Sequence, residues 1–332
     1  MNVPIPVTLL TGFLGAGKTT LLNRILGERH GEKIAVIENE FGEVGIDNEL
    51  LRSGDDEIVE MNNGCICCTV RGDLIRILGE LAEQRAAGTL AFDRVLIETT
   101  GLADPGPVAQ TFFLDASIAA RYRLDAVITL VDAVHAMRQL DAHEVAQRQV
   151  GFADRLLLAK TDLVDAVQIE ALSQRLKRIN PRAPIGAAPF GQTPLAEILD
   201  IRGFQLDATL TIDPAFLAGG HHHHDDRIQS FVFRAQRDFD GQRLQDFLAD
   251  VVRLFGVDLL RYKGVLAVDQ LPRRVIIQGV HELMGSSAGV PWHDDEPRHS
   301  VMVFIGSDLP REIIEQGLTR CLCAADMPNG KK

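Results

Sequence analysis

Glycines, a lysine and two threonines stand close together near the start of the chain. The segment Gly12-Phe-Leu-Gly-Ala-Gly-Lys18-Thr19 matches the pattern G-x-x-x-x-G-K-[ST], whose glycines let backbone N–H groups curl around phosphate oxygens. An apolar run precedes it and a helical pattern follows, and a helix N-terminus attracts an anion. Lys18 is expected to act in catalysis by reaching the β- and γ-phosphates, and Thr19 to bind Mg²⁺. The predicted nucleotide contacts here are Gly12, Gly15, Ala16, Gly17, Lys18, Thr19 and Thr20.

Acidic residues end two later apolar runs. Glu98 closes Val95-Leu-Ile-Glu98, and Gly101 follows three residues on. An acid in this position can hold the Mg²⁺ shell, while the Gly101 amide can sense the γ-phosphate. We therefore predict Glu98 as a second catalytic residue, binding Mg²⁺ with Thr19, and Gly101 as a nucleotide contact. The competing candidate is Asp132, which lacks the following glycine and is disfavoured for that reason.

A possible base-recognition motif follows another apolar run. Ala159-Lys-Thr-Asp162 resembles N-K-x-D, in which the Asp carboxylate accepts two guanine N–H donors that adenine does not offer. The stem of Lys160 would pack on the ring. Ala159 stands where that motif has Asn, so the strictness of guanine selection stays open. The alternative is an ordinary strand-to-loop transition.

Three thiols within four residues form the second strong pattern. Cys65, Cys67 and Cys68 follow the turn Asn63-Gly64, and thiolates so spaced can converge on one soft metal ion. Their density exceeds what packing requires, although a redox switch would also use adjacent thiols. The preceding segment supplies carboxylates that could join either metal or be solvated, namely Glu38, Glu40 and Glu43.

Other potential ligands are weaker. His221–His224, followed by Asp225 and Asp226, could gather Zn²⁺, Ni²⁺ or Co²⁺ loosely, or be a solvated linker. The isolated His281, His293 and His299 are expected to be structural. For Cys321 and Cys323 a half-buried helix end is favoured over a second thiol site.

The surrounding patterns indicate how these residues are positioned. Apolar runs predict buried strands at residues 5–10, 33–38, 94–98, 125–131 and 155–159, and helical spacing predicts helices at 19–29, 71–85 and 166–179. Strands alternating with helices predict an α/β fold with a mostly parallel sheet covered on both faces.

The pattern changes after about residue 207. We expect a nucleotide-binding domain at 1–207, a His-containing linker at 208–227, and a smaller α+β domain at 228–323. The smaller domain should contain strands at 229–234, 260–268, 274–280 and 300–305, with helices at 241–255 and 310–321. This β-α-β-β-β-α order suggests an antiparallel sheet.

The composition and patterning of the chain argue against nucleic-acid-binding, secreted and membrane proteins. The chain has 332 residues, enough for two domains, and a formal net charge of -12 that disfavours nucleic-acid binding. No N-terminal signal pattern and no membrane-spanning apolar stretch is present, so we expect a cytoplasmic protein without membrane contact. Clustered cysteines fit a reducing compartment better than a disulfide framework.

Together the motifs resemble those of the CobW-type family of P-loop GTPases, and within it the YjiA branch. The matching segments span nearly the whole chain: residues 8–20, 37–43, 64–68, 104–108, 260–264 and 299–306. The resemblance implies slow, Mg²⁺-dependent GTP hydrolysis and transfer of a metal, often zinc, to a client metalloprotein, with cobalt and iron-linked clients in some branches. For this chain we expect Zn²⁺, with Co²⁺ or Ni²⁺ as alternatives. The resemblance also implies a metal site formed by Cys65, Cys67 and Cys68, with Glu38 and Glu43 as further ligands.

Two other functions compete with this one. A nucleotide-binding metal or redox sensor would bind the same ligands without a chaperone role, and a small-molecule P-loop kinase would leave the cysteine cluster unexplained. The physiological metal and the client stay open. So does the choice between a client and a second copy of the chain, forming a homo-oligomer, as the partner of the smaller domain.

Overall fold

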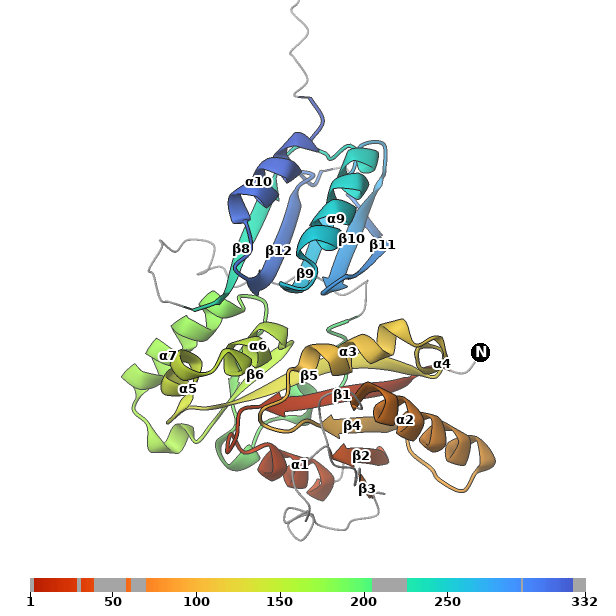
Figure 1. Ribbon diagram of the computed structural model, residues 1–332, viewed down its shortest axis with the longest axis vertical. Coiled ribbons are helices and arrows are strands. Elements are labelled where there is room, and N and C mark those ends of the chain that lie inside the picture. Colours follow the sequence, from red (N-terminus) through yellow and green to blue (C-terminus); the bar gives the residue numbers. More distant parts are fainter. Residues whose placement is uncertain are drawn as a thin grey trace, which may run out of the picture. The chain divides into compact units, whose positions relative to one another are not determined.

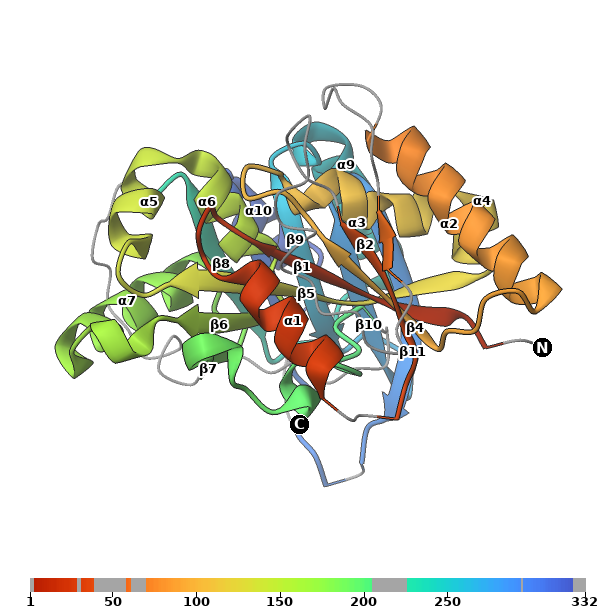
Figure 2. The same ribbon diagram turned by 90° about the horizontal axis from the view of Figure 1, so that it is seen from below.

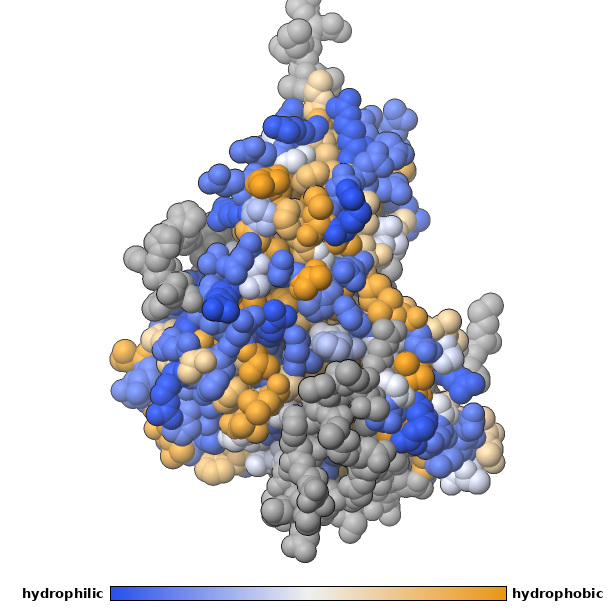
Figure 3. All heavy atoms as spheres, in the orientation of Figure 1, coloured by the Kyte–Doolittle hydropathy of each residue, from blue (hydrophilic) through white to orange (hydrophobic). Residues whose placement is uncertain are grey.

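The computed structural model describes residues 3–28, 31–38, 58–60, 70–204, 226–293 and 295–324. These residues fall into two compact units, one with residues 3–204 and 226–228 and the other with 229–324. The predicted domain bounds stay a prediction, because most of the proposed linker lies outside the described residues. In Figure 3 hydrophilic side chains, in blue, cover much of the described surface, as expected for a chain rich in charged residues.

The first unit contains a parallel sheet in the order β3-β2-β4-β1-β5-β6-β7. Its strands match the predicted runs and add two short ones at the sheet edges. They are β1 (Ile5–Gly12), β2 (Ile34–Glu38), β3 (Ile58–Glu60), β4 (Arg94–Glu98), β5 (Tyr122–Asp132), β6 (Arg155–Ala159) and β7 (Ile185–Ala187). Because the strands are parallel, their carboxyl ends meet at one edge, where ligands bind in such sheets.

Helices cover both faces of this sheet. Figure 1 shows α1 on one face and α2, α3 and α6 on the other, and Figure 2 gives the view from the α1 side. The helices are α1 (Lys18–Gly27), α2 (Val70–Ala87), α3 (Pro105–Leu114), α4 (Ala116–Ala119), α5 (Ala136–Ala142), α6 (Glu144–Phe152) and α7 (Ala166–Ile179). Among the described residues, short 3₁₀ turns add to them: η2 (Thr161–Leu163), η3 (Pro189–Gly191) and η4 (Leu195–Glu197). The predicted α/β architecture is confirmed.

Aliphatic side chains of α1 anchor the helix to the sheet. Leu21, Leu22 and Ile25 are fully buried in a cluster with side chains from β1, β2, β4, β5 and β6, which Ile198 and Leu199 complete. Burying such side chains contributes about 1.5–3 kcal/mol each. The N-terminus of α1 is thereby held at the carboxyl end of β1.

The second unit is an antiparallel sheet in the order β11-β10-β9-β12-β8, with two helices on one face (Figure 1). Its elements are β8 (Ile228–Ala235), α9 (Gly241–Phe255), β9 (Leu259–Leu266), β10 (Arg273–Val280), β11 (Leu283–Pro291), β12 (Ser300–Ser307) and α10 (Arg311–Arg320). The expected β-α-β-β-β-α order was wrong in lacking β11. That strand, Leu-Met-Gly-Ser-Ser-Ala-Gly-Val-Pro, lies at a sheet edge, buries few side chains and therefore has no apolar run.

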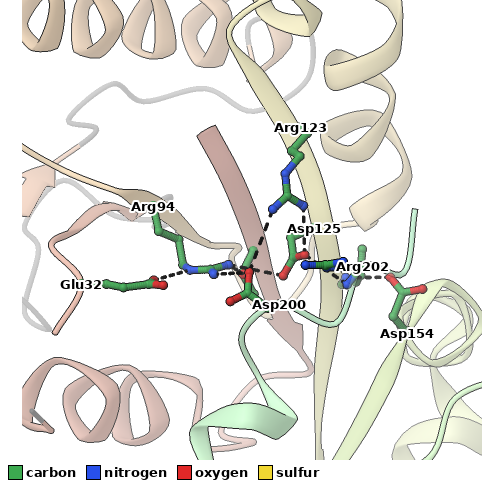
Figure 4. A network of polar contacts seen from close by, with 9 residues as sticks. Glu32, Arg94, Arg123, Asp125, Asp154, Asp200 and Arg202 are labelled. Carbon is green, nitrogen blue, oxygen red and sulfur yellow. Dashed lines mark hydrogen bonds and ion pairs between the residues drawn. The ribbon is translucent and has the colours of Figure 1, made fainter. Parts of the chain in front are cut away.

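A buried guanidinium ties together the amino ends of the first sheet (Figure 4). Arg94, 1% exposed at the start of β4, donates to Glu32 at 2.9 Å, to Asp200 at 2.7 Å and to the fully buried Asp125 at 3.3 Å. Burial alone would lower the pKa of Arg94, but the hydrogen bonds that it donates to Glu32 and Asp200 raise that pKa overall. The network thus joins β4 and β5 to the residues just before β2 and to the chain segment that contains Asp200.

We expect Arg94→Met to lower the free energy of unfolding by about 3–5 kcal/mol, because three carboxylates lose a shared buried partner. Urea unfolding followed by circular dichroism measures this. The control is Arg76→Met, since Arg76 is 48% exposed and pairs with Glu80 on the surface of α2. That change should cost less than about 1 kcal/mol. Equal, small losses in both variants would show that the buried network contributes little.

Candidate nucleotide site

The glycine-rich loop connects β1 to α1 with backbone conformations that favour glycine. Gly12, Gly15 and Gly17 have φ values of 143°, 73° and 96°. A Cβ on Gly12 would lie 2.4 Å from the carbonyl oxygen of Leu130 on β5, so a side chain there would push the loop off the sheet. The Ala16 N–H donates to the Phe13 carbonyl at 3.1 Å, closing the loop before the helix begins.

Lys18 and Thr19 occupy the first turn of α1, where the helix dipole favours an anion. Lys18 is buried, and its Nζ donates to the Gly12 carbonyl oxygen at 3.1 Å, so the ammonium lies over the loop. The Thr19 hydroxyl donates to Glu98 Oε1 at 3.3 Å. The structure therefore brings together the hydroxyl and the carboxylate that were predicted to bind Mg²⁺. Hard oxygen donors of this kind suit that ion.

Glutamates on adjacent strands lie in register beside Glu98. Glu38 at the end of β2 pairs with Glu98 on one side and with Glu60 on β3 on the other. Sequence reasoning did not single out Glu60, whose signal is only its place at the end of a three-residue strand. Glu38, a predicted metal ligand, thus lies one strand from the predicted Mg²⁺ site.

The predicted γ-phosphate sensor lies against the glycine-rich loop. A Cβ on Gly101 would be 2.6 Å from the Leu14 nitrogen, so only glycine permits this approach. The carbonyl oxygens of Gly101 and Ala103 accept hydrogen bonds from the buried Gln149 amide at 3.1 and 3.0 Å. Gln149 lies on α6, and the sequence analysis missed both the helix and this role.

The predicted base-recognition residues follow β6 on the opposite side of β1 from Glu98. Lys160 has a left-handed conformation, φ 58°, and its Nζ donates to Asp132 Oδ2 at 2.7 Å. Asp162 is exposed on η2. The Ala159 methyl faces the glycine-rich loop, 3.9 Å from where a Cβ on Gly17 would lie. Asp132, the competing Mg²⁺ candidate, therefore lies with the base-recognition motif.

A loop after β7 also borders the site and was not predicted. Gly191 on η3 packs against α1, where a Cβ on it would lie 3.1 Å from the Leu21 Cα and 3.2 Å from the carbonyl oxygen of Thr20. The neighbouring Phe190 has φ 52° and is 71% exposed. The sequence signal is a run of small residues, Gly186-Ala-Ala-Pro, that begins within the short strand β7 and continues into η3.

The predicted transition-metal ligands Cys65, Cys67, Cys68 and Glu43 lie outside the described residues, as do Glu40 and His221–His224. Within the described ranges no group of three or more His, Cys, Asp or Glu residues could hold a metal ion. Burial raises the pKa of the Cys321 thiol, which contacts the Arg243 carbonyl oxygen at 3.4 Å, consistent with the expected half-buried helix end.

Two described histidines have structural partners, as the sequence analysis expected. His281 is buried, with Nδ1 3.3 Å from the Gly256 carbonyl oxygen. The His299 ring lies edge-on to Trp292, with ring centroids 5.6 Å apart. Among the described residues, no helix is long and apolar enough to cross a membrane.

The parallel sheet, the glycine-rich loop and the Thr19–Glu98 contact define a P-loop nucleotide-binding protein with a second α+β domain. The chain belongs to the CobW family. Residues 6–186 match the family described as CobW/HypB/UreG, nucleotide-binding domain, and residues 228–322 match the cobalamin synthesis protein cobW C-terminal domain.

Known relatives are similar over almost the whole chain. The zinc chaperone YjiA of Escherichia coli is 46% identical over 312 residues, covering 94% of this chain and 96% of the relative. The zinc chaperone CobW of Pseudomonas aeruginosa is 35% identical, covering 96% and 92%. The crystal structure of Zn(II)-bound YjiA GTPase from E. coli has a TM-score of 0.81 at 40% identity, covering 97% of this chain and all of that one.

We expect Gly101→Ala to weaken binding of a non-hydrolysable nucleoside triphosphate analogue about 10-fold or more while changing diphosphate affinity less than about 2-fold. The added methyl would separate the sensor from Leu14, and only the triphosphate has a group for the sensor to contact. Titration calorimetry measures both affinities. The control is Gly79→Ala on α2, where an added Cβ has nothing within 4 Å. Equal weakening of both nucleotides would contradict the sensor role.

Proposed function

We propose that this protein binds and slowly hydrolyses GTP and uses the cycle to load a transition metal, zinc as first candidate, onto a client protein. The observation that carries the proposal is the row of strand ends at Glu98, Glu38 and Glu60. The row begins beside Thr19 at the nucleotide site. Its outer strands lead directly, along the sequence, into the segments that contain Glu43 and the three cysteines. The similarity to two zinc chaperones supports the same function.

In the nucleotide half of this proposal, the glycine-rich loop holds the phosphates by its backbone N–H groups. Lys18 neutralises the β- and γ-phosphate oxygens. Thr19 and Glu98 would hold Mg²⁺, which supplies charge stabilisation for phosphoryl transfer when bound. Lys160 and Asp162 would select guanine.

In the metal half, Cys65, Cys67 and Cys68 bind the transferred ion as thiolates, with Glu38 and Glu43 as oxygen ligands. Three thiolates suit Zn²⁺, and carboxylates add affinity for Co²⁺ or Ni²⁺. Closely spaced thiols stay reduced in a cytoplasmic environment, where the proposal places the protein. The ion is the cargo of the cycle.

Nucleotide and metal affinities would be coupled through β2. γ-Phosphate contacts order the segments that follow Glu38 and Glu60, and this brings the thiolates together. Hydrolysis removes those contacts and favours release of the metal. By linkage, bound metal must change GTP affinity by the same factor. A metal or redox sensor without a client is the alternative, and it would show nucleotide-independent metal affinity.

We expect Zn²⁺ and Co²⁺ to bind at least about 5-fold more tightly in the presence of a non-hydrolysable GTP analogue than of GDP, the lower end of typical coupling. The measurement is a competition titration with a chelating indicator. A Cys65/Cys67/Cys68→Ser triple variant should lose the difference, while Cys321→Ser and Cys323→Ser should keep it. Metal affinity that is indifferent to nucleotide would favour the sensor.

Guanine selection has its own test. Asp162→Asn should lower GDP affinity about 10-fold or more and raise affinity for xanthosine diphosphate, because Asn offers an N–H donor to the xanthine carbonyl in place of the carboxylate acceptor. Fluorescent-nucleotide displacement measures both. Unchanged GDP affinity would show that base selection lies elsewhere. Asp165→Asn, at the N-cap of α7, is the matched control.

A further inference from the structure

We infer that Asp132 is a positioning residue for nucleobase recognition: its buried carboxylate fixes Lys160 so that the lysine stem forms one wall of the base site. This inference rests on the proposed guanine-nucleotide site and adds a residue to it. The sequence alone had placed Asp132 as a competitor for the Mg²⁺ shell.

Both carboxylate oxygens of Asp132 accept hydrogen bonds. Asp132 ends β5 and is 1% exposed. Its Oδ1 accepts the N–H groups of Val134 at 2.9 Å and His135 at 3.2 Å, while its Oδ2 accepts Lys160 Nζ at 2.7 Å. The two backbone bonds fix the carboxylate in the loop after β5. The second oxygen then determines where the lysine ammonium can lie.

The strand order places Asp132 apart from the residues that are predicted to hold Mg²⁺. Asp132 lies in register with Ala159 on β6, whereas Glu98 on β4 lies on the other side of β1 and contacts Thr19. A Mg²⁺ ion held by Thr19 would therefore have Glu98 beside it. Asp132 instead lies with the motif whose last residue, Asp162, is proposed to read guanine.

Lys160 can form one wall of the base site because its backbone and its ammonium group are both held while its side chain stays partly exposed. Its backbone is held in a left-handed conformation, φ 58°, and its carbonyl accepts the Leu163 N–H at 3.1 Å in η2. Its ammonium is held by Asp132, yet the side chain is still 37% exposed. A lysine fixed at both ends loses little conformational entropy when a ring packs on its stem.

The ion pair also explains why Ala is tolerated at position 159. An Asn there could link neighbouring loops through its amide, whereas the Ala159 methyl faces the glycine-rich loop at 3.9 Å from the Cβ position of Gly17. Asp132 and Lys160 supply a link between the loop after β5 and the loop after β6. Base recognition can therefore be organised without a side-chain amide at 159.

The test compares Asp132→Asn with the wild type. Asn keeps an oxygen for the Val134 and His135 N–H groups but turns an amide donor toward the lysine ammonium. GDP affinity should fall about 10-fold, as expected when a hydrogen bond to a charged group is lost. Affinity for inorganic triphosphate and kcat at saturating GTP should each stay within about 2-fold, because the phosphate side is untouched.

A double-variant cycle tests the route of the effect. Lys160→Met should weaken GDP binding, and adding Asp132→Asn to it should weaken binding no further, because Asp132 acts only through Lys160. Lys160→Met also carries the test if Asp132→Asn folds poorly. Asp154→Asn is the control: Asp154 is a buried acid at the opposite edge whose Oδ2 accepts the Val127 N–H at 2.9 Å. It should lower stability without changing GDP affinity.

Three outcomes would overturn the inference. They are unchanged GDP affinity in Asp132→Asn, equal loss of GDP and inorganic triphosphate, and loss of Mg²⁺-dependent hydrolysis at unchanged GDP affinity. The last would place Asp132 in the Mg²⁺ shell. A wild type that does not prefer GDP over ADP would instead refute the proposed guanine site, and that failure is visible before any variant is measured.

Discussion

The parallel pairing of β1 with β4 on one side and β5 on the other is the constraint on which the site depends. It places Leu10 beside Glu98 and Gly12 beside Leu130, so the glycine-rich loop starts between two acidic strand ends. The close approach of Gly12 to the Leu130 carbonyl allows the loop to lie directly on the sheet. The role proposed for a residue depends on whether it lies on the β4 side or on the β5 side of β1.

The two sides have different chemistry. On the β4 side, glutamate positions are paired in register along the backbones of β4, β2 and β3, and the segments that follow β2 and β3 contain the proposed metal ligands. On the β5 side, the acid at the strand end is neutralised by Lys160 and held by backbone N–H groups. The β4 side, with its acidic residues, suits cations. The β5 side, where the carboxylate is paired with a lysine, suits an uncharged ring. The phosphates would lie between them.

Much of this arrangement could be predicted from the sequence because long apolar runs and a spaced glycine motif carry strong signals. The bounds of α7 were predicted as Ala166–Ile179, where an Asp165–Gln168 capping box begins the helix. Elements with weak periodicity were missed, including α6, which supplies Gln149, and the edge strand β11. The Asp132–Lys160 pair was also missed, because contact between the ends of two different strands is set by register, which a single sequence does not display. The cysteine site stays a prediction.

The Arg94 network lies apart from the residues that are proposed to bind ligands. This buried ion-pair network lies at the amino edge of the first sheet, where Glu32, Asp125 and Asp200 contact one guanidinium. The ligand-binding groups lie at the opposite edge. Substitutions of exposed side chains at the carboxyl edge would leave this network intact, so binding groups can change there while the ion pairs at the amino edge are kept. A change of binding group would then be limited by the chemistry of the ligand more than by the stability that the network provides.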